Sequence, residues 1–245
     1  MSGLVIVSGA SRGLGAELLR QVPFSARTVD LSRTARAADS AHEHVAVDLA
    51  TEAGWLRAAG FFDETIAQHA GERVILFHNA GTLDPIGFAG EVDAPAYTRN
   101  VLLNSAAPQI LGDAFLRAAA RHSVRGTLVM ISSGAADKVY EGWSSYCAGK
   151  AALEHWVRTA GAEQARRAGC NVFSIRPGVV DTEMQSEIRN TAPRDFPEVA
   201  RFIDRYHTGG LRAPNEVARD LWMLLEREPA NGSVLGDSDL GMPAR

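Results

Sequence analysis

Residues 4–15 read LVIVSGASRGLG: a short apolar run from Leu4 to Ser8 passes directly into a turn with Gly9, Gly13 and Gly15. The run has the length and composition of a buried strand, and the residues after the turn have the pattern of a helix. Glycine allows a tight turn in which the backbone approaches a pyrophosphate closely, and the N–H groups at a helix N-terminus bind phosphate. The stretch therefore predicts a strand–turn–helix unit that binds a dinucleotide.

Further short apolar runs alternate with helix-length segments along the rest of the chain. The predicted strands are residues 4–8, 28–31, 44–47, 73–78, 126–132, 171–176 and 233–235, and the predicted helices include 13–22, 104–122, 146–168 and 214–226. Strands that are apolar on both faces are typical of a parallel sheet covered by helices on both sides. We therefore expect an α/β fold over residues 1–245: a single-domain, Rossmann-type, doubly wound parallel sheet with helices on both faces. A ligand is expected at the carboxyl ends of the strands.

The composition argues against several other classes of protein. The formal net charge of −4 gives no broad basic field for a nucleic acid. No apolar run approaches the roughly 20 residues of a membrane helix, and residues 1–7 lack the basic segment of a signal peptide. The two cysteines, Cys147 and Cys170, belong to no close Cys/His cluster, so no metal site is expected. We expect a cytoplasmic protein that binds neither nucleic acid nor membrane.

Residues 184–211 interrupt the alternation of strands and helices. This segment follows a predicted strand, carries Pro193 and Pro197, and has Gly209 and Gly210 near its end. A long insert at the ligand end of a sheet is usually functional. We interpret it as a substrate lid hinged near the two glycines; the alternative is a peripheral helical excursion.

A second set of residues can carry acid–base chemistry. Tyr146 and Lys150 are four residues apart in a predicted helix, so both side chains project from one face. Ser133 closes a predicted strand at the edge where a ligand is expected. A free tyrosine has a pKa of about 10 and is a poor acid at neutral pH, but a neighbouring lysine lowers that pKa, and Ser133 can donate a hydrogen bond to a developing oxyanion. The set can therefore protonate the oxygen of a small-molecule carbonyl substrate, with Tyr146 as the acid.

These motifs resemble those of the short-chain dehydrogenase/reductase family. The glycine turn has that family's spacing, with Ser8 in the place of a usual threonine, and the separation of Ser133 from Tyr146 and the Tyr-x-x-x-Lys spacing both match. The resemblance covers residues 4–235 and implies a nicotinamide-dependent oxidoreductase. It gives Asn104 the fourth catalytic position, in which it holds a water that relays protons to the lysine; Asn100 is a rival for this role.

The family resemblance also implies which residues bind the cofactor. Asp48 contacts the adenine edge, and residues 79–81 line the cofactor, with His78 in the place of a usual asparagine. In the segment 177–182, the backbone near Val180 meets the nicotinamide carboxamide, and Thr182 reaches the carboxamide or the phosphate. The full predicted set is Gly9, Ser11, Arg12, Gly13, Leu14, Gly15, Ser32, Arg33, Asp48, Asn79, Ala80, Gly81, Tyr146, Lys150, Pro177, Gly178, Val180 and Thr182.

The end of the second predicted strand bears on the choice between NAD and NADP. An acidic residue there holds the ribose hydroxyls of NAD, whereas an arginine accepts the 2′-phosphate of NADP. By the family's pattern Ser32 stands where the acid would sit, with Arg33 beside it and Arg12 as a second cation. This favours NADP. Asp30 leaves the alternative open, because a slip of two residues would place its carboxylate near the ribose.

Two segments narrow the resemblance within the family. Residues 142–150 look like the sepiapterin reductases, and residues 132–136 and 177–185 look like the bacterial benzil reductases. Both groups reduce one carbonyl of a vicinal dicarbonyl, which makes this the implied reaction. Trp143 and Met184 are expected to form an apolar substrate wall, with plain core packing as the alternative. Asp239, or Asp237, could hold a pterin.

Other interpretations of the sequence remain open. The chain could be a dinucleotide sensor without turnover, although it keeps the Tyr/Lys pair that such sensors lack. It could also be an NAD-linked alcohol dehydrogenase that works in the oxidative direction. The family's habit suggests a homodimer or homotetramer.

Overall fold

A computed structural model of the chain describes residues 3–35, 42–71, 73–236 and 238–240. These residues form a seven-stranded, entirely parallel sheet with the strand order β3-β2-β1-β4-β5-β6-β7. The strands are β1 (Gly3–Ser8), β2 (Ala26–Ser32), β3 (Glu43–Ala46), β4 (Val74–His78), β5 (Gly126–Ile131), β6 (Asn171–Ile175) and β7 (Val234–Leu235). The strand order reverses between β1 and β4, which is where ligands bind in open α/β sheets.

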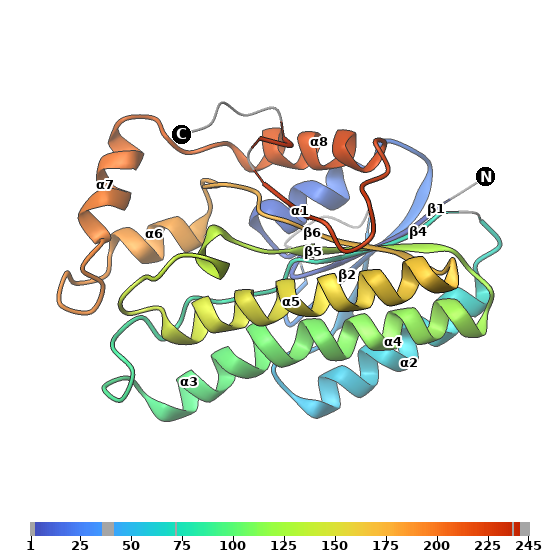
Figure 1. Cartoon of the computed structure of the whole chain (residues 1–245), viewed down its shortest axis with the longest axis horizontal. Coiled ribbons are helices and arrows are strands. Elements are labelled where there is room, and N and C mark those ends of the chain that lie inside the picture. Colours follow the sequence, from blue (N-terminus) through green and yellow to red (C-terminus); the bar gives the residue numbers. More distant parts are fainter. Residues whose placement is uncertain (1–2, 36–41, 72, 237, 241–245) are drawn as a thin grey trace.

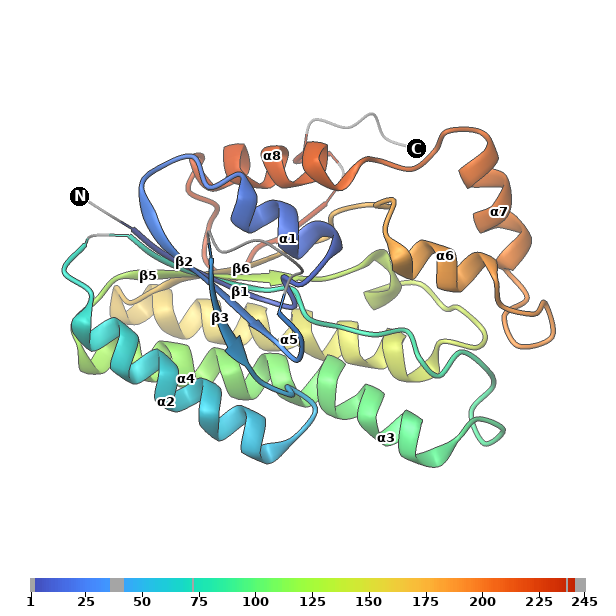
Figure 2. The ribbon, with the colours of Figure 1, turned by 180° about the vertical axis from the view of Figure 1, so that it is seen from behind.

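Helices cover both faces of the sheet (Figures 1 and 2). One face carries α1 (Gly13–Arg20) and α8 (Pro214–Leu225), and the other carries α2 (Glu52–Gln68), α4 (Ala107–Arg121) and α5 (Ser144–Arg167). The expected single-domain, doubly wound Rossmann-type fold is confirmed. Within the described residues, no helix has both the length and the apolar character that a membrane span requires.

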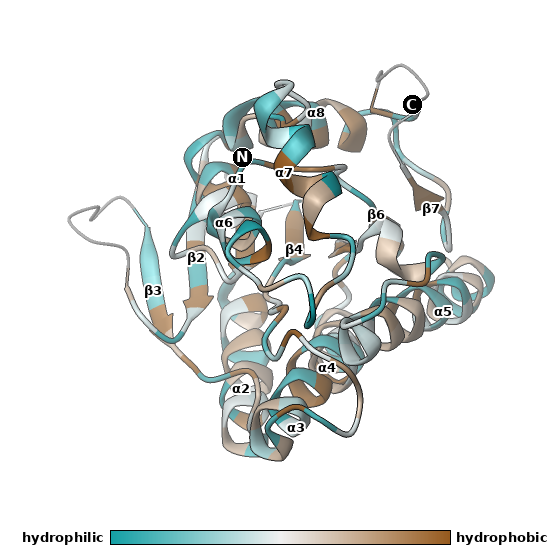
Figure 3. Cartoon of the chain, turned by 90° about the vertical axis from the view of Figure 1, so that its left-hand side faces the viewer, coloured by the Kyte–Doolittle hydropathy of each residue, from teal (hydrophilic) through white to brown (hydrophobic). Residues whose placement is uncertain are grey.

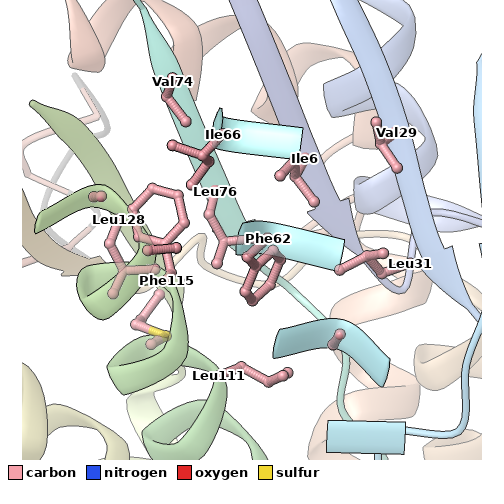
Figure 4. Close-up of a cluster of buried hydrophobic side chains, with 14 of the residues drawn as sticks. Ile6, Val29, Leu31, Phe62, Ile66, Val74, Leu76, Leu111, Phe115 and Leu128 are labelled. Carbon is pink, nitrogen blue, oxygen red and sulfur yellow. The ribbon is translucent and has the colours of Figure 1, made fainter. Parts of the chain in front are cut away.

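Each face of the sheet packs an apolar core against its helices. The core toward α2 and α4 includes Phe62 and Phe115, whose rings meet edge-to-face with centroids 6.1 Å apart (Figure 4). The core toward α1 and α8 includes Phe77 and Trp222, which also meet edge-to-face at 5.1 Å. Because β1 and β4 are buried along their whole length, the strands read as continuous apolar runs in the sequence.

The helix expected at residues 104–122 begins earlier in the structure. Helix α3 (Ala94–Val101) continues through a π-helical turn η1 (Leu102–Ala106) into α4. The Asp93 side chain caps its N-terminus by accepting a hydrogen bond from Ala96 N–H at 2.9 Å. Aspartate three residues before that N–H is a capping signal, which marks the true start of the helix. The π turn itself places Asn104 at a local widening, a feature often found at functional sites.

The segment 184–211 is partly helical. It contains most of α6 (Glu183–Arg189) and all of α7 (Val199–His207), which lie at the carboxyl end of the sheet (Figures 1 and 3). Gly209 follows α7 with φ = 70°, a conformation that favours glycine. The residues on either side of this segment are joined by a short parallel bridge between Val180 and Arg212.

Candidate active site

The glycine turn between β1 and α1 disfavours side chains at its glycine positions. Gly9 and Gly13 adopt φ values of 67° and 58°, and a Cβ on Gly15 would lie 2.5 Å from the Gly9 carbonyl oxygen. The N-terminus of α1 has no side-chain cap, so its first N–H groups remain available to a phosphate. Leu14 is buried, whereas Arg12 is exposed at the rim. This tight turn, which forms a cradle at the uncapped N-terminus of α1, fits the pyrophosphate of a dinucleotide.

Asp30 supports the turn from the neighbouring strand. Its Oδ1 accepts a hydrogen bond from Ala10 N–H at 3.0 Å. Its Oδ2 accepts one from the Ser32 hydroxyl at 2.7 Å and lies 3.2 Å from His44 Nδ1. The carboxylate is therefore committed to protein partners, and Ser32 and Arg33 stand at the strand end beyond it, which is the register that the sequence interpretation assumed.

Ser8 joins the carboxyl ends of β1 and β4. Its hydroxyl oxygen accepts hydrogen bonds from the backbone N–H groups of Asn79 and Ala80 at 3.0 and 3.1 Å, and lies 3.1 Å from His78 Nδ1. The Asn79 amide donates to the Gly9 carbonyl at 3.0 Å. Burial, together with the charge of Lys150, lowers the pKa of His78 to about 3, so its ring is neutral. His78 therefore replaces the usual asparagine with a neutral hydrogen-bonding partner for Ser8.

Asp48, the predicted adenine contact, is bound by a residue that the sequence interpretation missed. Arg99 Nη2 donates to both carboxylate oxygens of Asp48, at 2.9 and 2.7 Å. Burial opposes ionisation of Asp48, but the hydrogen bonds from Arg99 and Ala50 and the charge of Arg33 lower its pKa overall. Asp48 and Arg33 therefore belong to one charged group at the edge of β2 and β3.

The structure brings three of the four predicted catalytic residues together beyond the end of β5. Ser133 and Tyr146 share a side-chain hydrogen bond, and Lys150 Nζ lies 5.6 Å from the centroid of the Tyr146 ring. Lys150 also donates a hydrogen bond to the carbonyl oxygen of Ile131, the last residue of β5, at 2.8 Å. The first turns of α5 thus present a phenol and an ammonium side by side at the carboxyl edge of the sheet.

The pKa of Tyr146 moves in the direction opposite to the sequence expectation. Burial raises it to about 12, which the hydrogen bond with Ser133 only partly offsets. Burial also lowers the pKa of Lys150 to about 8, against the charge of Glu154, which raises it. Desolvation disfavours the charged form of each group. The expectation of a lowered Tyr146 pKa was wrong for this structure, because the effect of burial is larger than that of the hydrogen bond with Ser133.

Asn104 lies beside Lys150 across Gly81. A Cβ on Gly81 would come within 3.0 Å of Asn104 Oδ1 and 3.7 Å of Lys150 Nζ. Asn104 Oδ1 accepts from Thr82 N–H at 3.1 Å, and its amide donates to the Thr82 carbonyl at 2.7 Å and to Asn100 Oδ1 at 2.8 Å. Asn100 thus supports Asn104 from one turn away, and Asn104 is the one of the two that faces Gly81.

The loop after β6 closes the site toward the glycine turn. Gly178 adopts φ = 75°, and Val180 is buried. A Cβ on Gly13 would lie 3.2 Å from the Thr182 methyl group, so Thr182 lies against the glycine turn. Arg12 forms an ion pair with Glu183, the first residue of α6; the sequence offered no signal for this contact between distant segments.

The predicted substrate residues lie in an aromatic cluster next to Tyr146. Trp143 is 4% exposed, meets Tyr146 edge-to-face at 5.8 Å and stacks on Phe196 of the 184–211 segment at 4.4 Å with an interplanar angle of 4°. Met184 packs against the same cluster. The cluster holds the 184–211 segment against the start of α5.

The two acidic candidates near the C-terminus are Asp239 and Asp237. Asp239 is exposed, and its Oδ2 accepts a hydrogen bond from Gly236 N–H at 2.9 Å within its own turn. Asp237 lies outside the described residues. In the part of the chain that the structure describes, no group of three or more histidine, cysteine or acidic side chains could hold a metal ion.

The strand order of the parallel sheet reverses between β1 and β4, next to the glycine cradle and the Tyr/Lys/Ser group. Together these features define a Rossmann-type oxidoreductase. A family model described as short chain dehydrogenase matches residues 3–193, and the chain belongs to this family, whose fold binds a nicotinamide dinucleotide. The chain is therefore a short-chain oxidoreductase.

Three known proteins illustrate what the chain is similar to. Benzil reductase ((S)-benzoin forming) of Bacillus subtilis (strain 168) is 36% identical over 236 residues, which cover 94% of this chain and 96% of that protein. Sepiapterin reductase of Mus musculus is 31% identical over 224 residues, 84% of each chain. The crystal structure of the KRED1-Pglu enzyme superposes with a TM-score of 0.79 at 28% identity, and the match covers 95% of this chain and all of that one.

Proposed function

We propose that this protein is an NADPH-dependent reductase that converts one carbonyl of a small vicinal dicarbonyl to an alcohol. The observation that carries the proposal is the group formed by Ser133, Tyr146 and Lys150 beside the glycine cradle. The benzil and sepiapterin reductases to which the chain is similar support the substrate class.

The residues divide the reaction between them. A reduced nicotinamide, when bound, supplies the hydride that adds to the carbonyl carbon. Ser133 donates a hydrogen bond to the carbonyl oxygen and stabilises the charge that develops there. Tyr146 gives its phenolic proton to that oxygen and forms the alcohol, while the Lys150 ammonium stabilises the resulting phenolate. Asn104, supported by Asn100, holds a water through which the proton is replaced.

The cofactor preference follows from charge at the end of β2. Asp30 is engaged by Ala10 and Ser32, which leaves Arg33, and Arg12 at the rim of the turn, to meet a 2′-phosphate. A guanidinium presents paired donors that suit phosphate oxygens. These contacts favour NADPH over NADH.

The substrate class follows from the chemistry of the cluster around Tyr146. In a vicinal dicarbonyl the second carbonyl withdraws electrons, so the first accepts hydride more readily. A flat conjugated body suits an apolar wall of Trp143 and Met184. We propose that the segment 184–211 is the lid that closes over this wall, with its hinge at Gly209 and Gly210. We place the enzyme in the cytoplasm as a homodimer or homotetramer.

A panel of ketones tests the substrate proposal. NADPH oxidation is followed with benzil-like 1,2-diketones and with monoketone analogues of matched size, and the product is identified as a hydroxyketone. We expect kcat/KM to be clearly higher for the diketones. Equal efficiency with the monoketones would contradict the dicarbonyl proposal and leave the broader carbonyl reductase proposal standing.

A further inference from the structure

Helix α5 buries a carboxylate one turn beyond Lys150 that the reaction described above does not use. The Glu154 side chain is 1% exposed. Its Oε1 accepts hydrogen bonds from the Ser132 hydroxyl and from Arg176 Nε, both at 2.7 Å, and its Oε2 accepts one from Arg176 Nη2 at 2.6 Å. Arg158, half-exposed on the same helix, lies farther away at 3.4 Å. Both oxygens of the carboxylate are therefore engaged by polar or charged side chains.

The partners of Glu154 lie directly beside the catalytic and cofactor segments. Ser132 immediately precedes Ser133, and its neighbour Ile131 accepts the hydrogen bond from Lys150. Two residues one turn apart on α5, Lys150 and Glu154, therefore hold two consecutive residues at the end of β5. This two-point attachment sets the position from which Ser133 reaches Tyr146.

The second partner extends the attachment to the loop after β6. Arg176 directly precedes Pro177 and Gly178. Besides its bonds to Glu154, it forms an ion pair with Asp137, in which Arg176 Nη1 lies 2.5 Å from Asp137 Oδ2. The backbone adds to this connection, because Ser132 N–H donates to the Ile175 carbonyl at 2.8 Å. The ends of β5 and β6 and the helix α5 thus meet at one carboxylate.

The charge of Glu154 also acts on Lys150. Burial lowers the pKa of Lys150, and the negative charge of Glu154 raises it. The other ionisable groups that face the ammonium are Tyr146 on α5, neutral below its pKa of about 12, and His78 on β4, neutral above its pKa of about 3. Near neutral pH, Glu154 is the member of this group that supplies a negative charge.

We propose that Glu154 is a positioning residue that fixes Ser133 through Ser132, fixes the Pro177–Gly178 turn through Arg176, and stabilises the ammonium form of Lys150. The proposal rests on the proposed carbonyl reductase function for its effect on turnover. Its electrostatic part is independent of any substrate.

The lysine content of the chain allows a direct test. The sequence contains two lysines, Lys138 and Lys150, and Lys138 is exposed. Protein labelled with ¹³C at the lysine ε-carbon therefore gives two resonances in a pH titration, and Lys138→Arg assigns them. Glu154→Gln removes the charge and keeps the size of the side chain. The matched control is Glu163→Gln, the same change at an exposed position farther along α5.

We expect Glu154→Gln to lower the titration midpoint of Lys150 by about one pH unit, with Lys138 unchanged and Glu163→Gln without effect. Glu154→Asp provides a second variant should the glutamine protein not fold. It withdraws the charge by one methylene, so the midpoint moves in the same direction by a smaller amount. If the folded variants leave the Lys150 midpoint at its original value, the proposal is wrong.

Turnover supplies the second readout. With NADPH and a diketone, Glu154→Gln should lower kcat about tenfold with less change in KM for the ketone, and Glu154→Asp should restore part of the loss. A loss confined to thermal stability, with kcat retained, would overturn the positioning role. If the wild-type protein reduces no carbonyl, the proposed function fails, and the NMR titration still decides the electrostatic role of Glu154.

Discussion

The backbone N–H of Ala10 donates a hydrogen bond to Asp30 Oδ1 at 3.0 Å and so joins the glycine turn to the end of β2. Asp30 is 2% exposed, and its other oxygen accepts from Ser32. The proposed preference for NADP treats this buried, engaged carboxylate as a support of the turn and not as a ligand of the ribose hydroxyls. The sequence alone left Asp30 as the argument for NAD; its contacts make it a support of the turn.

Cofactor preference should therefore depend on Arg33. Arg33→Ala removes a charge-assisted phosphate contact worth roughly 1.5–3 kcal/mol, so KM for NADPH should rise about ten- to a hundredfold while KM for NADH barely changes. Steady-state kinetics with both cofactors measure this. Arg57→Ala, an exposed arginine on α2, is the control. A wild-type protein that prefers NADH, or equal damage to both cofactors, would refute the assignment.

Glu183 should compete with the cofactor for Arg12. The two side chains form an ion pair, and both are more than half exposed, so the pair contributes little to stability. Glu183→Gln frees the guanidinium, and Kd for NADPH should fall about two- to fivefold with no change in Kd for NADH. Titration of nucleotide fluorescence gives both constants. An unchanged Kd for NADPH would mean that Arg12 does not reach the 2′-phosphate.

The space around Gly15 and Gly60 predicts that an added methyl group disturbs the protein at the first position and stabilises it at the second. In Gly15→Ala the new Cβ would lie 2.5 Å from the Gly9 carbonyl oxygen, so the turn must open, and dinucleotide affinity should fall at least about tenfold. In Gly60→Ala, on α2, nothing lies within 4 Å of the new methyl group, and the protein should gain about 0.4–1 kcal/mol. Dinucleotide titration and thermal unfolding test the pair. Normal affinity in Gly15→Ala would show that the turn does not form the cradle.

The pH dependence should follow Lys150. Its pKa is lowered to about 8, chiefly by burial, so the ammonium is present below pH 8 and is lost above it. Tyr146, with its pKa raised to about 12, keeps its proton throughout this range. The value of kcat/KM for NADPH, which reports groups of the free enzyme, should therefore fall with rising pH around pH 8. A flat profile to pH 10 would show that the charge of Lys150 is not required.

The parts of this account that the sequence predicted are those set by local geometry. Gly9, Gly13 and Gly15 follow an apolar strand because the turn sterically excludes Cβ atoms, and Tyr146 and Lys150 share a helix face because they are four residues apart. Both features are determined by neighbours in the chain, so the fold and the Tyr/Lys pair could be predicted from pattern and spacing.

The parts that the sequence did not predict depend on contacts between distant segments. Arg12 forms an ion pair with Glu183 on α6, and Arg99 on α3 forms one with Asp48. The pKa of Tyr146 rises because the site is buried, and Phe196, fifty residues later, stacks on Trp143 as part of that burial. No local pattern records such packing. Glu154 is an exception that could have been found, because it stands four residues after Lys150.

The central claim is that Tyr146 donates the proton in a carbonyl reduction, and Tyr146→Phe tests it most directly. The change removes the hydroxyl and keeps the ring that packs against Trp143. With NADPH and a 1,2-diketone, kcat should fall at least about a hundredfold, while Kd for NADPH stays within about twofold of the wild-type value because phenylalanine preserves the ring packing. Retention of wild-type turnover in Tyr146→Phe would contradict the account, because another group would then be the acid.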